Sequence, residues 1–155
     1  GNVDTRIKKL KDGEYDAILL ACAGIKSLDL ENEISQFFST SEIIPSAGQG
    51  IIALQCRESD NEMIELLNKI NDKHAHFCAL AERNVLKILE GDCETAVGVH
   101  AKINNNEIEL DAELFSLDGT KRYNEKKIGA IDSAGKLGRE VGINLKKRSN
   151  DLYKK

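Results

Sequence analysis

Residues 89–98 read LEGDCETAVG and lie where a long helical pattern ends and an alternating, strand-like pattern begins. The change of period predicts a loop, and this loop carries both a glycine and a cysteine. A cysteine that only fills a core needs no such loop, whereas a thiol between two elements can reach a ligand. Cys93 is therefore the best candidate for covalent chemistry in the chain.

Downstream of this loop, the pattern predicts three antiparallel strands. Residues 95–103 and 107–115 alternate apolar and polar side chains on either side of a turn at 104–106. An Asp-Gly pair, typical of hairpin turns, then leads into a third strand at 120–128.

Helices flank these strands. Residues 73–90 predict a helix that ends at Gly91, and residues 133–147 predict another, although Gly138 and Gly142 lower its helix propensity. The apolar side chains on one face are Phe77, Leu80, Ala81, Val85, Ile88 and Leu89 in the first helix and Leu137, Val141 and Leu145 in the second. Two helices and a three-stranded meander make a small α+β domain.

The first half of the chain has an α/β pattern. Residues 4–11 predict a short helix, and residues 15–21 form an apolar run typical of a parallel strand buried on both faces. Residues 21–27 then connect strand to helix, which is where open α/β sheets bind ligands. Residues 45–50 hold the only proline and predict a hinge, and residues 51–57 predict a second strand. A helix at 60–71 follows, with its apolar side chains at Met63, Ile64, Leu66, Leu67 and Ile70.

The composition is that of a folded, slightly acidic protein. Of 155 residues, 41% are hydrophobic and 31% are charged, which excludes a disordered chain. A formal net charge of −4 gives no support for nucleic-acid binding. No apolar run approaches the roughly 18 residues of a membrane span and no signal-peptide pattern opens the chain, so we expect a cytoplasmic protein. The start at Gly1, within a helical pattern, indicates a piece of a longer protein.

The four cysteines have no zinc-ligand spacing, so we predict no metal site. In a reducing compartment all four should be thiols. Cys22, Cys56 and Cys78 lie in or beside apolar stretches, and we expect them to pack in cores as small hydrophobic side chains. Cys93 differs because its neighbours are polar residues and a glycine.

Four segments, taken in order, resemble hydroxymethylbilane synthase, also called porphobilinogen deaminase. They are GNVDTR at 1–6, DAILLACAG at 16–24, PSAGQG at 45–50 and LEGDC at 89–93. Each motif alone is weak, but their combination is specific and the similarity extends along nearly the whole chain. The resemblance implies an enzyme of haem biosynthesis that joins four porphobilinogen units, with loss of ammonia, on a covalently bound dipyrromethane primer and releases hydroxymethylbilane.

The resemblance also implies a domain organisation. Residues 1–46 correspond to the latter part of a second domain that resembles periplasmic binding proteins. Residues 47–68 correspond to the hinge and to a segment that returns to the first domain. Residues 69–155 correspond to the third, α+β domain, which has a three-stranded antiparallel sheet and carries the cofactor cysteine.

Most of the first domain is absent from this chain, and the catalytic aspartate of the family belongs to it. We therefore predict no catalytic residue within the chain and no turnover by the chain alone. Its partners should be porphobilinogen, the growing oligopyrrole and the missing N-terminal part, in a full-length enzyme expected to be monomeric.

The matched positions predict the cofactor site. Cys93 corresponds to the cysteine that carries dipyrromethane through a thioether. Because the substrate and the primer bear acetate and propionate groups, the site needs cations and backbone N–H donors. The other cofactor-binding candidates are Asn2, Arg6, Ala21, Gly24, Lys26, Gln49 and Gly50.

Several residues differ from the common family pattern. Ser27 stands where many members have a substrate-binding arginine, and the adjacent Lys26 supplies a point charge rather than a bidentate guanidinium. Asp92, Glu94 and Ala96 stand in place of the common glycine, glutamine and proline. Two additional carboxylates beside the cysteine disfavour both a thiolate and an anionic primer.

Two other functions fit parts of the pattern. A ligand-binding or sensory module with a binding-protein-like half would need no covalent cofactor, so an adduct on Cys93 distinguishes it from the enzyme. A cysteine-nucleophile hydrolase would need a histidine–acid pair, which the sequence does not reveal. The residues that we interpret as structural or solvated rather than catalytic are Asp16, Glu82, His74, His76 and His100.

Overall fold

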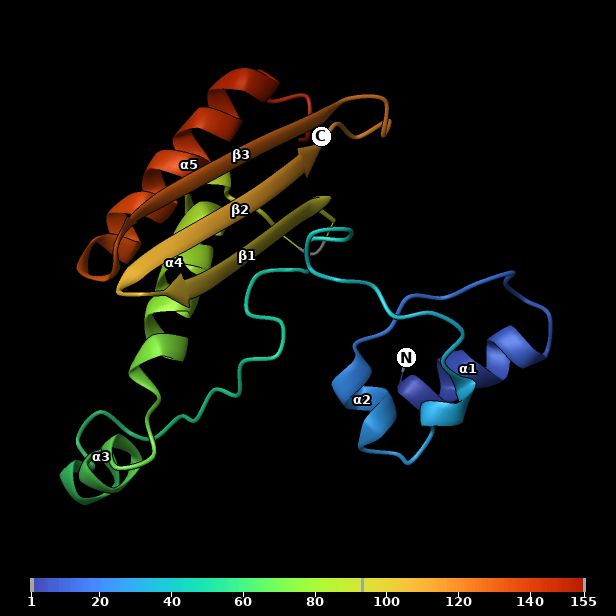
Figure 1. The fold of residues 1–155 in the computed structure, drawn as a ribbon, viewed down its shortest axis with the longest axis horizontal. Coiled ribbons are helices and arrows are strands. Elements are labelled where there is room, and N and C mark those ends of the chain that lie inside the picture. Colours follow the sequence, from blue (N-terminus) through green and yellow to red (C-terminus); the bar gives the residue numbers. More distant parts are fainter. Residues whose placement is uncertain (1, 93, 155) are drawn as a thin grey trace. The chain divides into compact units, whose positions relative to one another are not determined.

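A computed structural model of the protein describes residues 2–92 and 94–154 (Figure 1). The chain divides into two compact units, residues 1–38 and residues 39–155. The first unit contains α1 (Val3–Lys11), α2 (Cys22–Lys26) and a short 3-10 turn (Glu31–Glu33). Its buried apolar side chains are Ile7 of α1 and Ile25 of α2, so its core is very small.

The second unit holds the sheet. Its elements are α3 (Asn61–Asn68), α4 (Lys73–Leu89), β1 (Val97–Asn104), β2 (Glu107–Phe115), β3 (Arg122–Ala130), a 3-10 turn (Ile131–Ser133) and α5 (Ala134–Ser149). The three strands form one antiparallel sheet in the order β1-β2-β3. Helices α4 and α5 cover one face of this sheet (Figure 1). The predicted α+β domain with a three-stranded antiparallel sheet is therefore confirmed.

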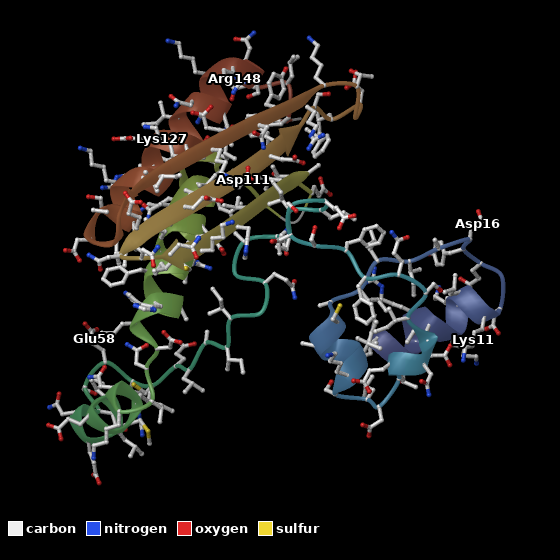
Figure 2. All side chains as sticks on the ribbon, viewed as in Figure 1. Lys11, Asp16, Glu58, Asp111, Lys127 and Arg148 are labelled. Atoms are coloured by element: carbon white, nitrogen blue, oxygen red, sulfur yellow. The ribbon has the colours of Figure 1, made fainter. Side chains whose placement is uncertain are left out.

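The central strand β2 shows how the sequence builds this layer. Ile108, Leu110, Ala112 and Leu114 are all fully buried, because residues two apart in a strand lie on the same face. The residues between them are charged and lie on the other face, as Asp111 does in Figure 2. Helices therefore cover only one face of the sheet, and the opposite face is polar.

The two helices meet through part of the faces that the sequence predicts, since Leu80 is exposed. Ala81, Val85 and Leu89 of α4 are buried, and the buried apolar residues of α5 include Leu137, Val141 and Leu145. A Cβ added at Gly138 would overlap the carbonyl oxygen of Ala81, so a side chain at this position would separate the helices. The glycine that lowers the helix propensity of α5 is thus what permits close packing against α4.

The predicted strands at 15–21 and 51–57 do not form, and this prediction is wrong for the chain as described. Within residues 2–92 and 94–154 the strands are β1, β2 and β3 alone. A strand requires a hydrogen-bonded neighbour, and neither segment has one here. Large apolar side chains in these segments are exposed instead, with 60% of Leu19 and 88% of Ile52 accessible to solvent.

Two further predictions need correction. The helix expected at 60–71 ends at Asn68, and its apolar residues Leu66 and Ile70 are exposed. Cys22 is exposed and Cys56 is only half-buried, because neither segment has a second layer against which a thiol could pack. Cys78 does pack beside the core of the second unit, as expected, and burial raises the pKa of its thiol.

Candidate functional site

The cysteine loop begins at the C-terminus of α4. The helix ends at Leu89, and Glu90 takes the left-handed conformation (φ 54°, ψ 33°) that the sequence assigns to Gly91. The amide of Gly91 donates to the carbonyl of Leu86 at 3.1 Å, which closes the helix end. Cys93, the predicted anchor, lies outside the described residues.

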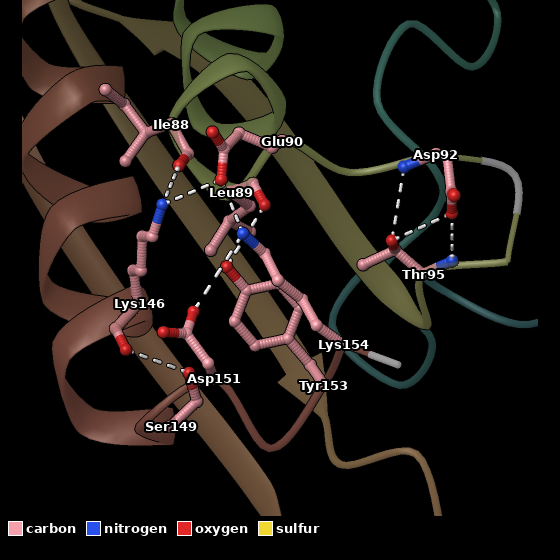
Figure 3. A network of polar contacts seen from close by, with 10 residues as sticks. All are labelled: Ile88, Leu89, Glu90, Asp92, Thr95, Lys146, Ser149, Asp151, Tyr153 and Lys154. Atoms are coloured by element: carbon pink, nitrogen blue, oxygen red, sulfur yellow. Dashed lines mark hydrogen bonds and ion pairs between the residues drawn. The ribbon is translucent and has the colours of Figure 1, made fainter.

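Asp92 organises the loop on both sides of the cysteine (Figure 3). Its Oδ1 accepts hydrogen bonds from the amides of Glu94 at 2.9 Å and Thr95 at 3.0 Å, and from the Thr95 hydroxyl at 3.1 Å. The Glu94 amide and the Thr95 hydroxyl hold the pKa of the Asp92 carboxyl below its usual range. An aspartate in place of the common glycine therefore closes an Asx turn, which is a structural reason for this departure from the family pattern.

The predicted hinge lies beside the strand that follows the loop. The carbonyl of Pro45 accepts a hydrogen bond from the amide of Val99 in β1 at 2.8 Å. A Cβ at Gly98 would lie 2.5 Å from the carbonyl oxygen of Ile44, so only glycine permits this close approach. The chain leading into the hinge and the strand leaving the cysteine loop are thus in direct contact.

The candidates Gln49 and Gly50 lie in the turn that ends the hinge. Gly48 and Gly50 both have positive φ, 79° and 81°, so the turn itself requires glycine at these positions. The Gln49 amide donates to the Ser46 carbonyl at 3.0 Å, and both Gln49 and Gly50 are exposed. The side chain of Gln49 and the backbone of Gly50 are therefore accessible to a ligand.

A buried carboxylate connects this turn to the sheet. Glu82 of α4 is only 4% exposed; its Oε2 accepts a hydrogen bond from the Gly48 amide at 2.7 Å and its Oε1 from the Ala101 amide at 2.8 Å. His100 Nδ1 lies 3.9 Å from Oε1. Glu82 is structural, as interpreted from the sequence, but its two partners were not foreseen. The sequence does place Glu82 beside Ala81 and Val85 on the apolar side of the helix. A carboxylate buried there needs hydrogen-bond donors, which is how its partners could have been expected.

The remaining candidates lie in the first unit, on α1 and α2. Asn2 precedes α1 and its carbonyl accepts from the amide of Arg6 at 3.0 Å. Arg6 is exposed on α1, and Lys26 is exposed at the end of α2. Neither cation has an ion pair with another described residue of the chain, so both are available to carboxylate groups.

The short helix α2 explains the small residues of the predicted site. The Ala21 carbonyl accepts from the Gly24 amide at 3.1 Å, which begins the helix. A Cβ at Gly24 would lie 3.2 Å from the Val3 side chain, so the glycine permits α2 to approach α1. The Ser27 hydroxyl donates to the Gly24 carbonyl at 2.9 Å. Ser27 thus caps the end of α2, and the positive charge at this helix end is that of Lys26.

Features of residues 2–92 and 94–154 also bear on other kinds of site. Among the described residues, no group of three histidine, cysteine or acidic side chains could hold a metal ion. A hollow of about 600 Å³ is lined by residues that include Leu54, Arg57 and Met63, but by none of the candidates. In the part of the chain described, no helix combines the length and the apolar character needed to cross a membrane.

Comparison with known proteins finds a matching family model for each of two parts of the chain. A family model described as "Porphobilinogen deaminase, dipyromethane cofactor binding domain" matches residues 1–65. A second, described as "Porphobilinogen deaminase, C-terminal domain", matches residues 76–147. The chain belongs to the porphobilinogen deaminase family. All candidates except Cys93 fall within the first match, and the cysteine loop falls within the second.

Relatives among porphobilinogen deaminases are similar along nearly the whole chain. The chain is 41% identical over 151 residues to the porphobilinogen deaminase of Coxiella burnetii, covering 97% of this chain and 49% of that protein. It is 37% identical over 151 residues to the one from Prochlorococcus marinus (97% and 48%) and 35% over 145 residues to the one from Syntrophobacter fumaroxidans (94% and 47%). The chain therefore spans about half the length of the curated relatives it matches.

Proposed function

We propose that this chain acts in a hydroxymethylbilane synthase, which joins four porphobilinogen units on a dipyrromethane primer bound to Cys93. The observation that carries this proposal is the match of residues 1–65 to the cofactor-binding domain of porphobilinogen deaminase. The loop geometry supports it, because Asp92 accepts hydrogen bonds from the amides of Glu94 and Thr95 and the hinge packs against the next strand. The sensory-module alternative has no support in the comparisons, since both family models describe the enzyme.

The proposed role of Cys93 is that of a permanent tether. Its sulfur forms one S–C bond to the methylene carbon of a porphobilinogen-derived unit as the C–N bond of the aminomethyl group breaks, and the thiol proton leaves with ammonia. The bound primer supplies the pyrrole carbon to which each new unit is joined. A covalent tether prevents the primer from dissociating during repeated additions.

The proposed role of the first unit is to hold carboxylates. The exposed cations Arg6 and Lys26 suit the acetate and propionate groups of the substrate and the primer. The small side chains at Ala21 and Gly24 would permit a ligand to approach the backbone closely. Because Ser27 carries no charge, the adjacent Lys26 supplies part of the charge of the arginine common at this position, as a point ammonium rather than a bidentate guanidinium.

The domain assignment is part of the same proposal. Residues 1–46 would complete a binding-protein-like domain, residues 47–68 would return to a first domain, and residues 69–155 would form the third. Exposed apolar side chains in the first two segments, among them Leu19 and Ile52, would then be covered by the N-terminal part of a cytoplasmic, monomeric enzyme. The segments predicted as strands would find their hydrogen-bonded neighbours in that part.

Turnover tests this function. The complete polypeptide containing these residues should consume porphobilinogen and release hydroxymethylbilane, and Cys93→Ser should abolish the reaction. Cys22→Ser, the same change at an exposed cysteine of the first unit, should leave it intact. The chain of 155 residues alone should give no sustained product. Full activity in Cys93→Ser would overturn the proposed tether.

A further inference from the structure

The last four carbonyl groups of a helix lack partners within the helix, and in α4 all four are satisfied. Two bond to the loop itself: Leu86 O accepts from the Gly91 amide at 3.1 Å and Lys87 O from the Glu90 amide at 3.4 Å. The other two bond to side chains far along the chain (Figure 3). Lys146 Nζ donates to Ile88 O at 3.4 Å, and the Tyr153 hydroxyl donates to Leu89 O at 3.0 Å.

Tyr153 is the central member of this contact. It is only 2% exposed and packs with the core of the second unit, so its hydroxyl needs a partner inside the protein. That partner is the last carbonyl of α4, 64 residues away in sequence. A single buried hydrogen bond thus connects the segment after α5 to the base of the cysteine loop.

The segment after α5, residues 150–154, is itself held in place. Asn150 and Asp151 have positive φ, 48° and 57°, and reverse the chain at the end of α5. The Leu152 carbonyl then accepts from the Leu117 amide, next to the β2–β3 turn, at 3.0 Å. Tyr153 therefore directly follows a residue that is anchored to the β2–β3 connection, shortly after the end of α5.

Glu90 adds an electrostatic contact at the same place. Its carboxylate accepts from Lys146 Nζ at 2.9 Å and also from Lys154 Nζ. Glu90 is the left-handed residue where the chain leaves α4, a conformation that costs a non-glycine residue free energy. Because these ion pairs are exposed, they should contribute less than the buried Tyr153 hydrogen bond.

We propose that Tyr153, assisted by Lys154, is a positioning residue for the primer. It fixes the end of α4 at Leu89, and so the point from which residues 90–92 lead to Cys93. This inference rests on the proposed function, because it says that the hydrogen bond between Tyr153 and Leu89, outside the cofactor site, affects the attachment of the primer to Cys93. Neither side chain needs to touch the primer for this role.

Two conservative variants of the complete polypeptide test the proposal, each with a matched control. Tyr153→Phe removes one hydroxyl and keeps the ring in the core, and Tyr123→Phe removes the hydroxyl of a half-buried tyrosine on β3. Lys154→Met removes the charge beside Glu90, and Lys147→Met removes an exposed charge on α5. Cofactor-free protein is mixed with porphobilinogen, and the rate of adduct formation on Cys93 is followed by peptide mass.

The amide of Gly91 provides a readout independent of activity. Its hydrogen exchange should become about fivefold faster in Tyr153→Phe, the factor expected for losing one neutral hydrogen bond, and about twofold faster in Lys154→Met. Primer attachment should slow by similar factors, whereas KM for porphobilinogen in fully loaded enzyme should stay unchanged. Both controls should match the wild type in every measurement.

The outcomes separate this inference from the function on which it rests. Attachment at the wild-type rate in Tyr153→Phe, with the wild type carrying its primer, overturns the positioning role and leaves the proposed function standing. A wild type that never carries an adduct on Cys93 overturns both. Loss of thermal stability with unchanged attachment shows that Tyr153 only supports the fold, and this also overturns the inference.

Discussion

The carboxylate of Glu82 accepts a hydrogen bond from the backbone amide of Gly48 at 2.7 Å, across 34 residues of sequence. Its second oxygen accepts from the Ala101 amide in β1 at 2.8 Å. One buried side chain therefore holds the hinge turn and the strand that follows the cysteine loop in a fixed relation. Glu82 thus adds to the hydrogen bond between the Val99 amide and the Pro45 carbonyl in holding the hinge beside β1.

Glu82→Gln should lower the free energy of unfolding by about 2 kcal/mol, because an amide side chain has one acceptor oxygen for two N–H donors and carries no charge. Urea unfolding measures the loss, and faster exchange of the Gly48 and Ala101 amides would locate it. Glu107→Gln makes the same change at an exposed position of β2 and should have no effect. Equal stability of Glu82→Gln and the wild type would contradict this role.

Two glycines of α5 should respond differently to alanine. A Cβ at Gly138 would overlap the Ala81 carbonyl, whereas a Cβ at Gly135 would lie 3.5 Å from the Leu80 side chain, an ordinary contact. Gly138→Ala should destabilise the protein by about 3 kcal/mol, and Gly135→Ala should change stability by less than about 1 kcal/mol. Thermal unfolding compares the two variants. Similar stabilities would mean that α4 and α5 can separate at little cost.

The ion pairs of Glu90 predict a specific acid sensitivity. Hydrogen bonds from Lys154 and then Lys146 hold the pKa of the Glu90 carboxyl at about 2, against an ordinary value of 4.5. A lowered pKa means that the contact stabilises the folded state above pH 4.5 and that this contribution is lost as the pH falls from 4.5 toward 2.

An NMR titration of the Glu90 carboxyl carbon checks this prediction. The midpoint should lie near 2 at low salt and should move toward 4.5 in Lys154→Met or at high salt, because exposed pairs are screened. A wild-type midpoint of 4.5 at low salt would show that the lysines do not bind Glu90 in solution.

The Asx turn of the cysteine loop predicts a ranking of variants at Asp92. Asp92→Asn keeps an acceptor oxygen for the Thr95 amide, whereas Asp92→Gly, which restores the common family residue, removes it. Exchange of the Thr95 amide should be about fivefold faster in the glycine variant and close to wild type in the asparagine variant. The account is wrong if glycine leaves that amide as protected as aspartate does.

Local patterns predicted the α+β half of the fold well. The alternation in residues 107–115 predicts β2 with the bounds observed. Every second residue of a strand lies on the same face, so a few residues are enough to show the pattern, and a turn marks where it begins. Leu137, Val141 and Leu145 are buried as the helical period predicts. These features depend on residues close in sequence, which a single chain displays directly.

Features that depend on distant partners were not predictable. The segments 15–21 and 51–57 have strand-like composition, but the described chain provides no neighbouring strand. Glu82 and Tyr153 bond to backbone groups 34 and 64 residues away, and no side-chain motif marks such partners. The left-handed residue is Glu90 rather than Gly91, and its carboxylate meets Lys146 and Lys154 from the far end of the chain, which no local pattern marks.

Peptide mapping of the complete polypeptide by mass spectrometry, after maturation in cells that make porphobilinogen, tests the proposed tether most directly. The peptide containing Cys93 should carry a dipyrromethane adduct, and those containing Cys22, Cys56 and Cys78 should carry none. An unmodified Cys93 in a protein that still turns over porphobilinogen would contradict the account.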